Sequence, residues 1–188
     1  GEFLNLLNKR KTIRTFSQTP LNKEQLLMAL YCADGKTPKG NRTAPSAVKA
    51  YMVDIYVFVR NVNGIEKGIY KYNVISNMLD EYKKGDFTDA FKEAALRFNK
   101  KIIQNCGAIA VLVCDKKNLF SQKYNVRLPE SCAYIEAGHI SQNFLLAATK
   151  MNLAAVPATG FDNEKMLSAL GLNKSDYIAM YFNSLSNP

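Results

Sequence analysis

The residues best suited to binding chemistry lie in a basic segment near the N-terminus, residues 10–16 (RKTIRTF). In an extended chain the side chains alternate between two faces, so Arg10, Thr12 and Arg14 would share one face. Two guanidinium groups with a hydroxyl between them suit a phosphate, which offers several acceptor oxygens and about two negative charges. The alternative is a solvated basic face beside a helix end. The segment alone leaves both interpretations open.

The net charge also favours anionic ligands. Lys and Arg total 25 against 16 Asp and Glu, which gives a formal charge of +9. Such a balance suits nucleotides, phosphates, nucleic acid or a membrane surface. The lysines are spread along the chain, and no arginine-rich arm or RNP-type aromatic motif accompanies them, so we expect no nucleic-acid partner. No apolar run approaches the ~20 residues that span a bilayer, so we expect no membrane partner.

Metal-ligating and nucleophilic residues are sparse. The chain has four Cys and one His, and no two Cys have C-x-x-C spacing, so we expect neither a zinc site nor a disulfide framework. Cys106 and Cys114 flank an apolar run and should behave as small hydrophobes. His139 lies in a helical pattern, where a packed or surface role is expected more than a catalytic one. No triad, dyad or metal cluster is visible.

The length of 188 residues predicts one domain with a sizeable core, residues 1–188. No signal peptide is visible, so we expect a cytoplasmic protein. Because residue 1 is Gly rather than Met, a leader removed ahead of it is the open alternative.

Hydrophobic periodicity predicts an α+β fold, with a mixed or largely antiparallel sheet between helices. The longest predicted helix, residues 131–151, has a broad apolar surface and should be central to the core, to a subunit interface, or to both. Asn22 and Gln25 have capping-box spacing at the start of another helix. The predicted helices are 2–8, 23–33, 86–101, 131–151 and 163–170, and the predicted strands are 53–59, 68–72, 108–114, 153–157 and 177–183, with a turn and a short strand over 73–80.

Two loops are placed to border a site. Pro45 and Ser46 can open a short helix, whose free amides would face an anion, although an ordinary helix start explains the same residues. Residues 158–161 form a predicted tight turn. Gly160 in that turn can adopt a φ closed to other residues, or let a ligand approach the backbone.

These pieces occur in a fixed order: residues 10–16, 42–47 (RTAPSA), 68–72 (GIYKY), 138–148 (GHISQNFLLAA) and 157–161 (PATGF). Together they resemble the FMN-dependent nitroreductase family, and within it the branch of SagB-type azoline dehydrogenases. The resemblance implies a nitroreductase-like fold, an FMN cofactor, a homodimer with the long central helix at its interface, and cofactor sites built there by both subunits.

The resemblance also implies roles for single residues. Arg10, Lys11, Thr12 and Arg14 match the motif that binds the FMN phosphate and ribityl chain. Arg14 matches the position nearest flavin N1 and O2, where a cation would stabilise negative charge. No protein residue is implied as catalytic, because the flavin carries the redox chemistry.

The other implied cofactor residues come from three segments. A loop supplied by the other subunit covers the ring, the turn directs a backbone amide at flavin N5, and the long helix supports the interface and the site. Many members of the branch have Asn where this chain has Lys49, and their last strand runs into a Gly-Tyr-Pro motif where this chain has residues 181–183. The residues are Pro45, Ser46, Ala47 and Lys49 in the loop, Gln142 with Asn143 in the helix, and Thr159, Gly160 and Phe161 in the turn.

The sequence thus predicts an oxidoreductase that passes electrons from NAD(P)H through FMN to a small organic acceptor, nitroaromatic or quinone-like, by a ping-pong mechanism. One alternative is an azoline-type dehydrogenase acting on a peptide. The other is a flavin-binding protein without turnover.

Overall fold

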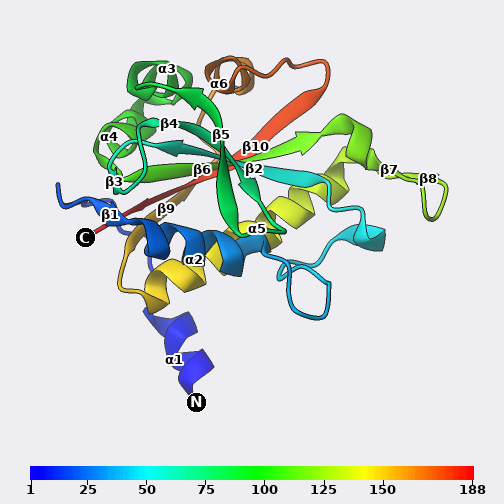
Figure 1. The fold of residues 1–188 in the computed structure, drawn as a ribbon, viewed down its shortest axis with the longest axis horizontal. Coiled ribbons are helices and arrows are strands. Elements are labelled where there is room, and N and C mark those ends of the chain that lie inside the picture. The colour runs from blue at the N-terminus through cyan, green and yellow to red at the C-terminus, as the bar shows by residue number, and fades with distance from the viewer.

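The computed structural model describes residues 1–188 and is built on one six-stranded sheet (Figure 1). Every pair of neighbouring strands in this sheet is antiparallel. The predicted sheet is therefore antiparallel rather than mixed. Its strand order is β5 (Met78–Lys84), β4 (Gly68–Asn73), β2 (Val53–Val59), β6 (Ala108–Asp115), β10 (Tyr177–Ser186) and β9 (Ala154–Ala158).

Strand β6 lies in the middle of the sheet because its sequence, AIAVLVCD, has little that water would solvate. All eight of its residues are buried, as a strand covered on both faces requires. Cys106 and Cys114, at the two ends of this region, are buried free thiols. Their burial agrees with the prediction that they behave as small hydrophobes, and it raises the pKa of both thiols to about 12.

Helices cover both faces of the sheet. Helices α2 (Lys23–Asp34) and α5 (Glu130–Lys150) pack on one face, in a core that includes Leu26 and Phe144. The other face packs against α3 (Thr88–Ala94), α4 (Arg97–Asn105) and α6 (Asn163–Leu170). Figure 1 shows these two layers, with α1 (Glu2–Lys9) projecting beyond the end of α5. The predicted long helix is confirmed.

Short elements connect these layers. A parallel two-residue pair joins β1 (Leu21–Asn22) to β3 (Val62–Asn63). A small hairpin joins β7 (Phe120–Ser121) to β8 (Val126–Arg127). Two 3-10 turns, η1 (Ala47–Lys49) and η2 (Lys116–Leu119), complete the chain.

Local capping signals place three helix ends where the sequence predicts them. At α2 the backbone amide of Asn22 donates to Gln25 Oε1 at 3.2 Å. The Asp162 carboxylate accepts from the amide of Lys165 at 2.9 Å at the start of α6. Gly171 ends α6 with a φ of 77°, in the left-handed region where Gly is favoured.

The single helix predicted over residues 86–101 is wrong. The structure has two helices, α3 and α4, with Ala95 extended between them (φ −77°, ψ 142°). The amide of Leu96 donates to the carbonyl of Gly160 at 2.9 Å, and Ala95 forms a β-bridge with Phe161. This long-range pairing breaks the helix, since the amide is no longer free to continue the helical pattern.

The two edges of the sheet differ in chemistry. Strand β5 runs to Lys84, further than the short strand predicted after residue 73, and has no buried residue. Its exposed charges include Asp80, Glu81 and Lys84, and Lys83 is half-buried. The opposite edge, β9, has a buried start and is followed by the turn at Gly160. None of the helices is both long and apolar enough to cross a membrane.

Candidate functional site

Residues 10–14, here called the basic ribbon, run extended against the β9 edge. The amide of Ile13 donates to the carbonyl of Ala155 at 3.2 Å, and the amide of Ser17 donates to the carbonyl of Asn187 at 3.0 Å. Phe16 packs against the core on the α3 and α6 side. The extended conformation expected from the sequence is therefore present, anchored by the backbone and by one aromatic ring.

The cations of the basic ribbon are not neutralised by the chain. Arg10 is half-buried, and Lys11 and Arg14 are exposed. None of these three side chains belongs to any of the ten ion pairs in the structure. Guanidinium and ammonium groups left without an acidic partner are available to an anionic ligand.

A polar cavity of about 460 Å³ opens beside the basic ribbon. Two of its lining side chains, Lys9 and Lys11, carry positive charge, so the cavity suits an anion better than an apolar ligand. Its lining residues are Asn8, Lys9, Lys11, Ile13, Thr149, Asn152, Leu153 and Pro188.

The turn after β9 is held from outside by α4. The carbonyl of Gly160 accepts from the amide of Leu96 at 2.9 Å and from Asn99 Nδ2 at 2.8 Å. A Cβ added at Gly160 would lie 2.7 Å from Asn99 Nδ2. A side chain at this position would displace the Asn99 amide, and Gly160 does not have a positive φ. The backbone amide of Gly160 donates to no acceptor of the chain.

Thr159 and Phe161, on either side of Gly160, make contacts that hold the turn. Thr159 is exposed, and its carbonyl accepts from the amide of Phe161 at 3.0 Å. The Phe161 ring packs on Phe182, with the ring centroids 5.9 Å apart. These contacts fix the backbone direction through Gly160.

The short helix that Pro45 and Ser46 could open is a single 3-10 turn, with Ser46 at its N-cap. Only this three-residue turn, η1, forms in the loop over residues 43–52. Val48, Lys49 and Tyr51 have φ values of 48°, 54° and 50°, which lie in the left-handed region and prevent helix propagation. Pro45, Ala47 and Lys49 are exposed and Ser46 is half-buried. Lys49 Nζ donates to Asn41 Oδ1 at 3.0 Å.

Arg42 and Asp34 form an ion pair at the base of this loop. Arg42 Nη1 lies 2.5 Å from Asp34 Oδ2, and its guanidinium lies over the Tyr51 ring, 4.4 Å from the centroid. Asp34 is 1% exposed. Burial raises the pKa of Asp34 to about 7, against the opposing effect of the Arg42 charge.

The long helix carries both predicted and missed residues. Gln142 is exposed on α5, whereas Asn143 is half-buried and faces the loop. Sequence reasoning missed Glu136 and assigned no role to His139, although both contact the 43–52 loop or its end. Their signal was the spacing of 136, 139 and 143, which puts three polar side chains on one face of a helix that is otherwise rich in apolar residues.

The predicted residues fall into two groups within one chain. The basic ribbon and the turn are both attached to β9, while the 43–52 loop lies near the start of α5 (Figure 1). His139 contacts Pro45, and Thr149 shares the polar cavity with Lys11. Ten residues of helix separate these two points, a distance of about 15 Å. The loop and the ribbon therefore lie at different points along α5.

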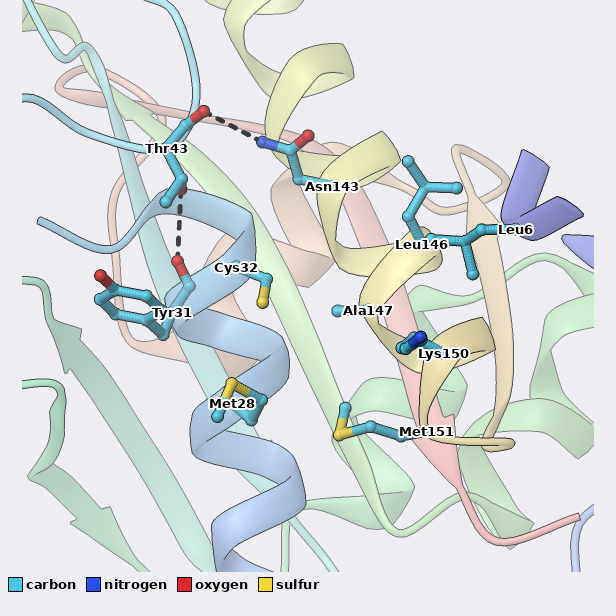
Figure 2. A pocket seen from close by; sticks show the side chains of 10 residues that line it. All are labelled: Leu6, Met28, Tyr31, Cys32, Thr43, Asn143, Leu146, Ala147, Lys150 and Met151. Atoms are coloured by element: carbon cyan, nitrogen blue, oxygen red, sulfur yellow. Dashed lines mark hydrogen bonds between the residues drawn. The ribbon is translucent and has the colours of Figure 1, made fainter. Parts of the chain in front are cut away.

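A second cavity, of about 480 Å³, lies between α1, α2 and α5 (Figure 2). Figure 2 shows Met28 facing it from α2 and Met151 from the end of α5, with Asn143 bonded to the Thr43 carbonyl at its rim. None of the predicted cofactor residues except Asn143 lines it, and its lining is mostly apolar. It does not suit a phosphate-bearing ligand.

Asp34 makes folding stability depend on pH in a defined direction. Because its pKa is raised in the folded chain and ordinary in the unfolded chain, the folded state holds the extra proton between about pH 4 and pH 7. Stability from this group is therefore complete at low pH and is lost as the pH rises through 7. In wild type, this group should lower the free energy of unfolding by on the order of 4 kcal/mol between these pH values. We expect Asp34→Asn to abolish that decrease, measured by urea denaturation at each pH.

Asp89, whose side chain is 97% exposed, provides the control. Asp89→Asn should leave the pH dependence of unfolding as in wild type. If Asp34→Asn also leaves it unchanged, the burial of Asp34 does not control its protonation.

This chain is similar to proteins described as nitroreductases. A family model described as the nitroreductase family matches residues 7–183. A provisionally named nitroreductase of Methanocaldococcus jannaschii is 33% identical over 165 residues, which cover 85% of this chain and 79% of that protein.

Solved structures share the fold. A provisionally named nitroreductase of Ralstonia eutropha JMP134 superposes with a TM-score of 0.80 at 22% identity, covering 98% of this chain and 81% of that one. Another, from Desulfovibrio desulfuricans in complex with FMN, has a TM-score of 0.71 at 17% identity, covering 100% and 87%. At these identities the likeness establishes the fold, and it confirms the predicted α+β architecture.

Proposed function

This chain belongs to the nitroreductase family, and from that premise we propose that it is an FMN-dependent oxidoreductase. It passes electrons from NADH or NADPH to a small organic acceptor, nitroaromatic or quinone-like, by a ping-pong mechanism. Bound FMN supplies the redox chemistry, since it can take up a hydride and give up electrons. The protein's part is to bind, orient and cover the cofactor.

One observation carries this proposal. The basic ribbon, whose cations have no acidic partner, is bonded to strand β9, and β9 leads into a turn whose Gly160 amide is free. Ile13 is bonded to Ala155, five residues before Gly160, a stretch of about 16 Å if extended. FMN is elongated, with a phosphate at one end and a ring at the other. A cationic group and a hydrogen-bond donor separated along one edge fit such a ligand.

Each residue of the ribbon and turn has a defined task in this proposal. Arg10, Lys11 and Thr12 bind the phosphate and the ribityl chain. Arg14 lies at the pyrimidine edge of the ring, where a positive charge stabilises negative charge near N1 and O2. The free amide of Gly160 donates to N5 and orients the ring, while Phe161, Thr159 and α4 keep that amide in place.

The proposal includes a homodimer. The loop contact and the ribbon cavity lie about 15 Å apart along α5, and we assign the loop that covers the ring to a second copy. Pro45, Ser46 and Ala47 make that cover, and the exposed Gln142 supports the contact between subunits. Lys49, already bonded to Asn41, stabilises the loop and is not needed as a direct flavin contact.

Removing two cations from the ribbon should remove FMN. Each charge-assisted contact is worth roughly 1.5–3 kcal/mol, so Arg10→Ala with Arg14→Ala should raise the FMN dissociation constant about 100-fold or more. Fluorescence titration of the apoprotein measures this constant. Lys67→Ala with Lys84→Ala, at the opposite sheet edge, removes the same charge and should bind FMN as wild type does. Equal affinity of both double variants would refute the ribbon as the phosphate site.

Mixed dimers test whether the loop acts across subunits. A ribbon variant (Arg10→Ala, Arg14→Ala) and a loop variant (Gly at residues 45, 46 and 47) should each lose FMN. A purified heterodimer of the two contains one intact ribbon facing one intact loop only if the loop acts in trans. We expect one FMN per heterodimer, counted from visible absorbance. No FMN in the heterodimer would mean that each loop serves its own chain.

Turnover separates this proposal from its alternatives. Under anaerobic conditions NADH or NADPH should bleach the absorbance of the bound flavin between about 350 and 500 nm, and a quinone should restore it. Initial rates at several acceptor concentrations should give parallel double-reciprocal lines. If neither donor bleaches the bound FMN, the proposal is refuted. The remaining alternatives are then a flavin-binding protein without turnover and a dehydrogenase such as the azoline type, which needs no nicotinamide donor.

A further inference from the structure

The 43–52 loop adopts a backbone that its residue types do not favour. Val48, Lys49 and Tyr51 all have positive φ, and the steric cost is highest for a β-branched residue such as Val48. The hydrogen bonds inside the loop are those of the amides of Lys49, Ala50 and Tyr51, and all three acceptors belong to Ser46 or Ala47. A strained segment persists only when its surroundings determine it, so the loop needs support from outside.

That support comes from one face of α5. The amide of Val53, just after the loop, donates to Glu136 Oε1 at 3.1 Å. His139 Nδ1 lies 3.2 Å from the carbonyl oxygen of Pro45, and donates to it in the tautomer protonated at Nδ1. Asn143 Nδ2 donates to the carbonyl of Thr43 at 3.3 Å. One rigid helix thus holds the backbone at both ends of the loop.

Glu136 is a buried carboxyl, and burying a carboxyl costs hydration free energy. It is 2% exposed, and its Oε2 has no hydrogen-bond partner. Burial raises the pKa of its carboxyl, while the Ser46 hydroxyl and the amides of Val53 and Met52 favour the charged form. The groups that favour its charge are in the loop, in Val53 directly after it, and in Arg42 directly before it. The Glu136 carboxyl therefore interacts mainly with the loop and with Val53 directly after it.

We propose that Glu136, His139 and Asn143 are positioning residues that hold residues 45–47 in the geometry needed to cover the flavin of a second subunit. This inference rests on the proposed function. The three side chains act through the loop backbone. They are additional residues of the proposed site, and they support the loop residues that contact the flavin ring.

Amide hydrogen exchange of the FMN-free protein tests the proposal. The bonded amides of Lys49, Ala50 and Tyr51 report directly on the loop. We expect His139→Ala, Asn143→Ala and Glu136→Leu to speed exchange in peptides over residues 43–52 at least tenfold, with exchange in β6 unchanged. His139→Asn should restore slow exchange, because the Asn amide nitrogen can donate from the place of Nδ1. Ser131→Ala, exposed on the same helix, should match wild type.

Bound FMN provides a readout that a purely structural role would not move. His139→Ala and Asn143→Ala should weaken FMN binding at least tenfold and change the visible circular dichroism of the flavin, and His139→Asn should restore both. Loop exchange equal to wild type in the alanine variants, or no rescue by His139→Asn, would overturn the proposal.

The two proposals fail separately. If wild-type protein binds no FMN, the proposed function falls, while the exchange result still reports whether α5 fixes the loop. If wild type binds FMN and the alanine variants bind it equally well with the same dichroism, the positioning role falls and the cofactor assignment remains.

Discussion

A sheet covered on both faces leaves a polar ligand only its edges and the ends of its helices. All eight residues of β6 are buried, with α2 and α5 packed below them and α3, α4 and α6 above. Cationic or amide groups placed inside these layers would lose their hydration without compensation. The basic ribbon and the turn at Gly160 accordingly lie along the β9 edge, where an extended backbone can pair and a charged ligand can remain partly hydrated.

Helix α5 connects the two halves of the proposed site. Its apolar side chains fill the core, its first half holds the 43–52 loop, and its last turn borders the ribbon cavity. The sequence motif within this helix pointed to site support, and the contact of Asn143 agrees with it. The loop conformation was beyond sequence reasoning, because Val48, Lys49 and Tyr51 carry no local signal for positive φ. Glu136 was hidden by the apolar periodicity around it.

Much of the fold could be predicted from the sequence because its signals are local. The seven apolar residues 108–114 of β6, the cap at Asp162 and the left-handed Gly171 each specify an element within a few residues of themselves. The break between α3 and α4 could not be predicted, since Leu96 gives its amide to Gly160, far along the chain. Hydrophobic periodicity predicts which residues share a face of one helix or strand, but it does not predict which faces pack together. The positions of the loop and the ribbon along α5 therefore could not be predicted from the sequence.

The β5 edge has a consequence for how copies of this chain can meet. An exposed strand usually offers its free amides and carbonyls to any neighbouring strand, and charges along it discourage that pairing. Here Asp80, Glu81, Lys83 and Lys84 stand on the outermost strand, whose register with β4 also shifts between Ile69 and Tyr70. These charges and the register shift discourage a strand of another copy from pairing with β5.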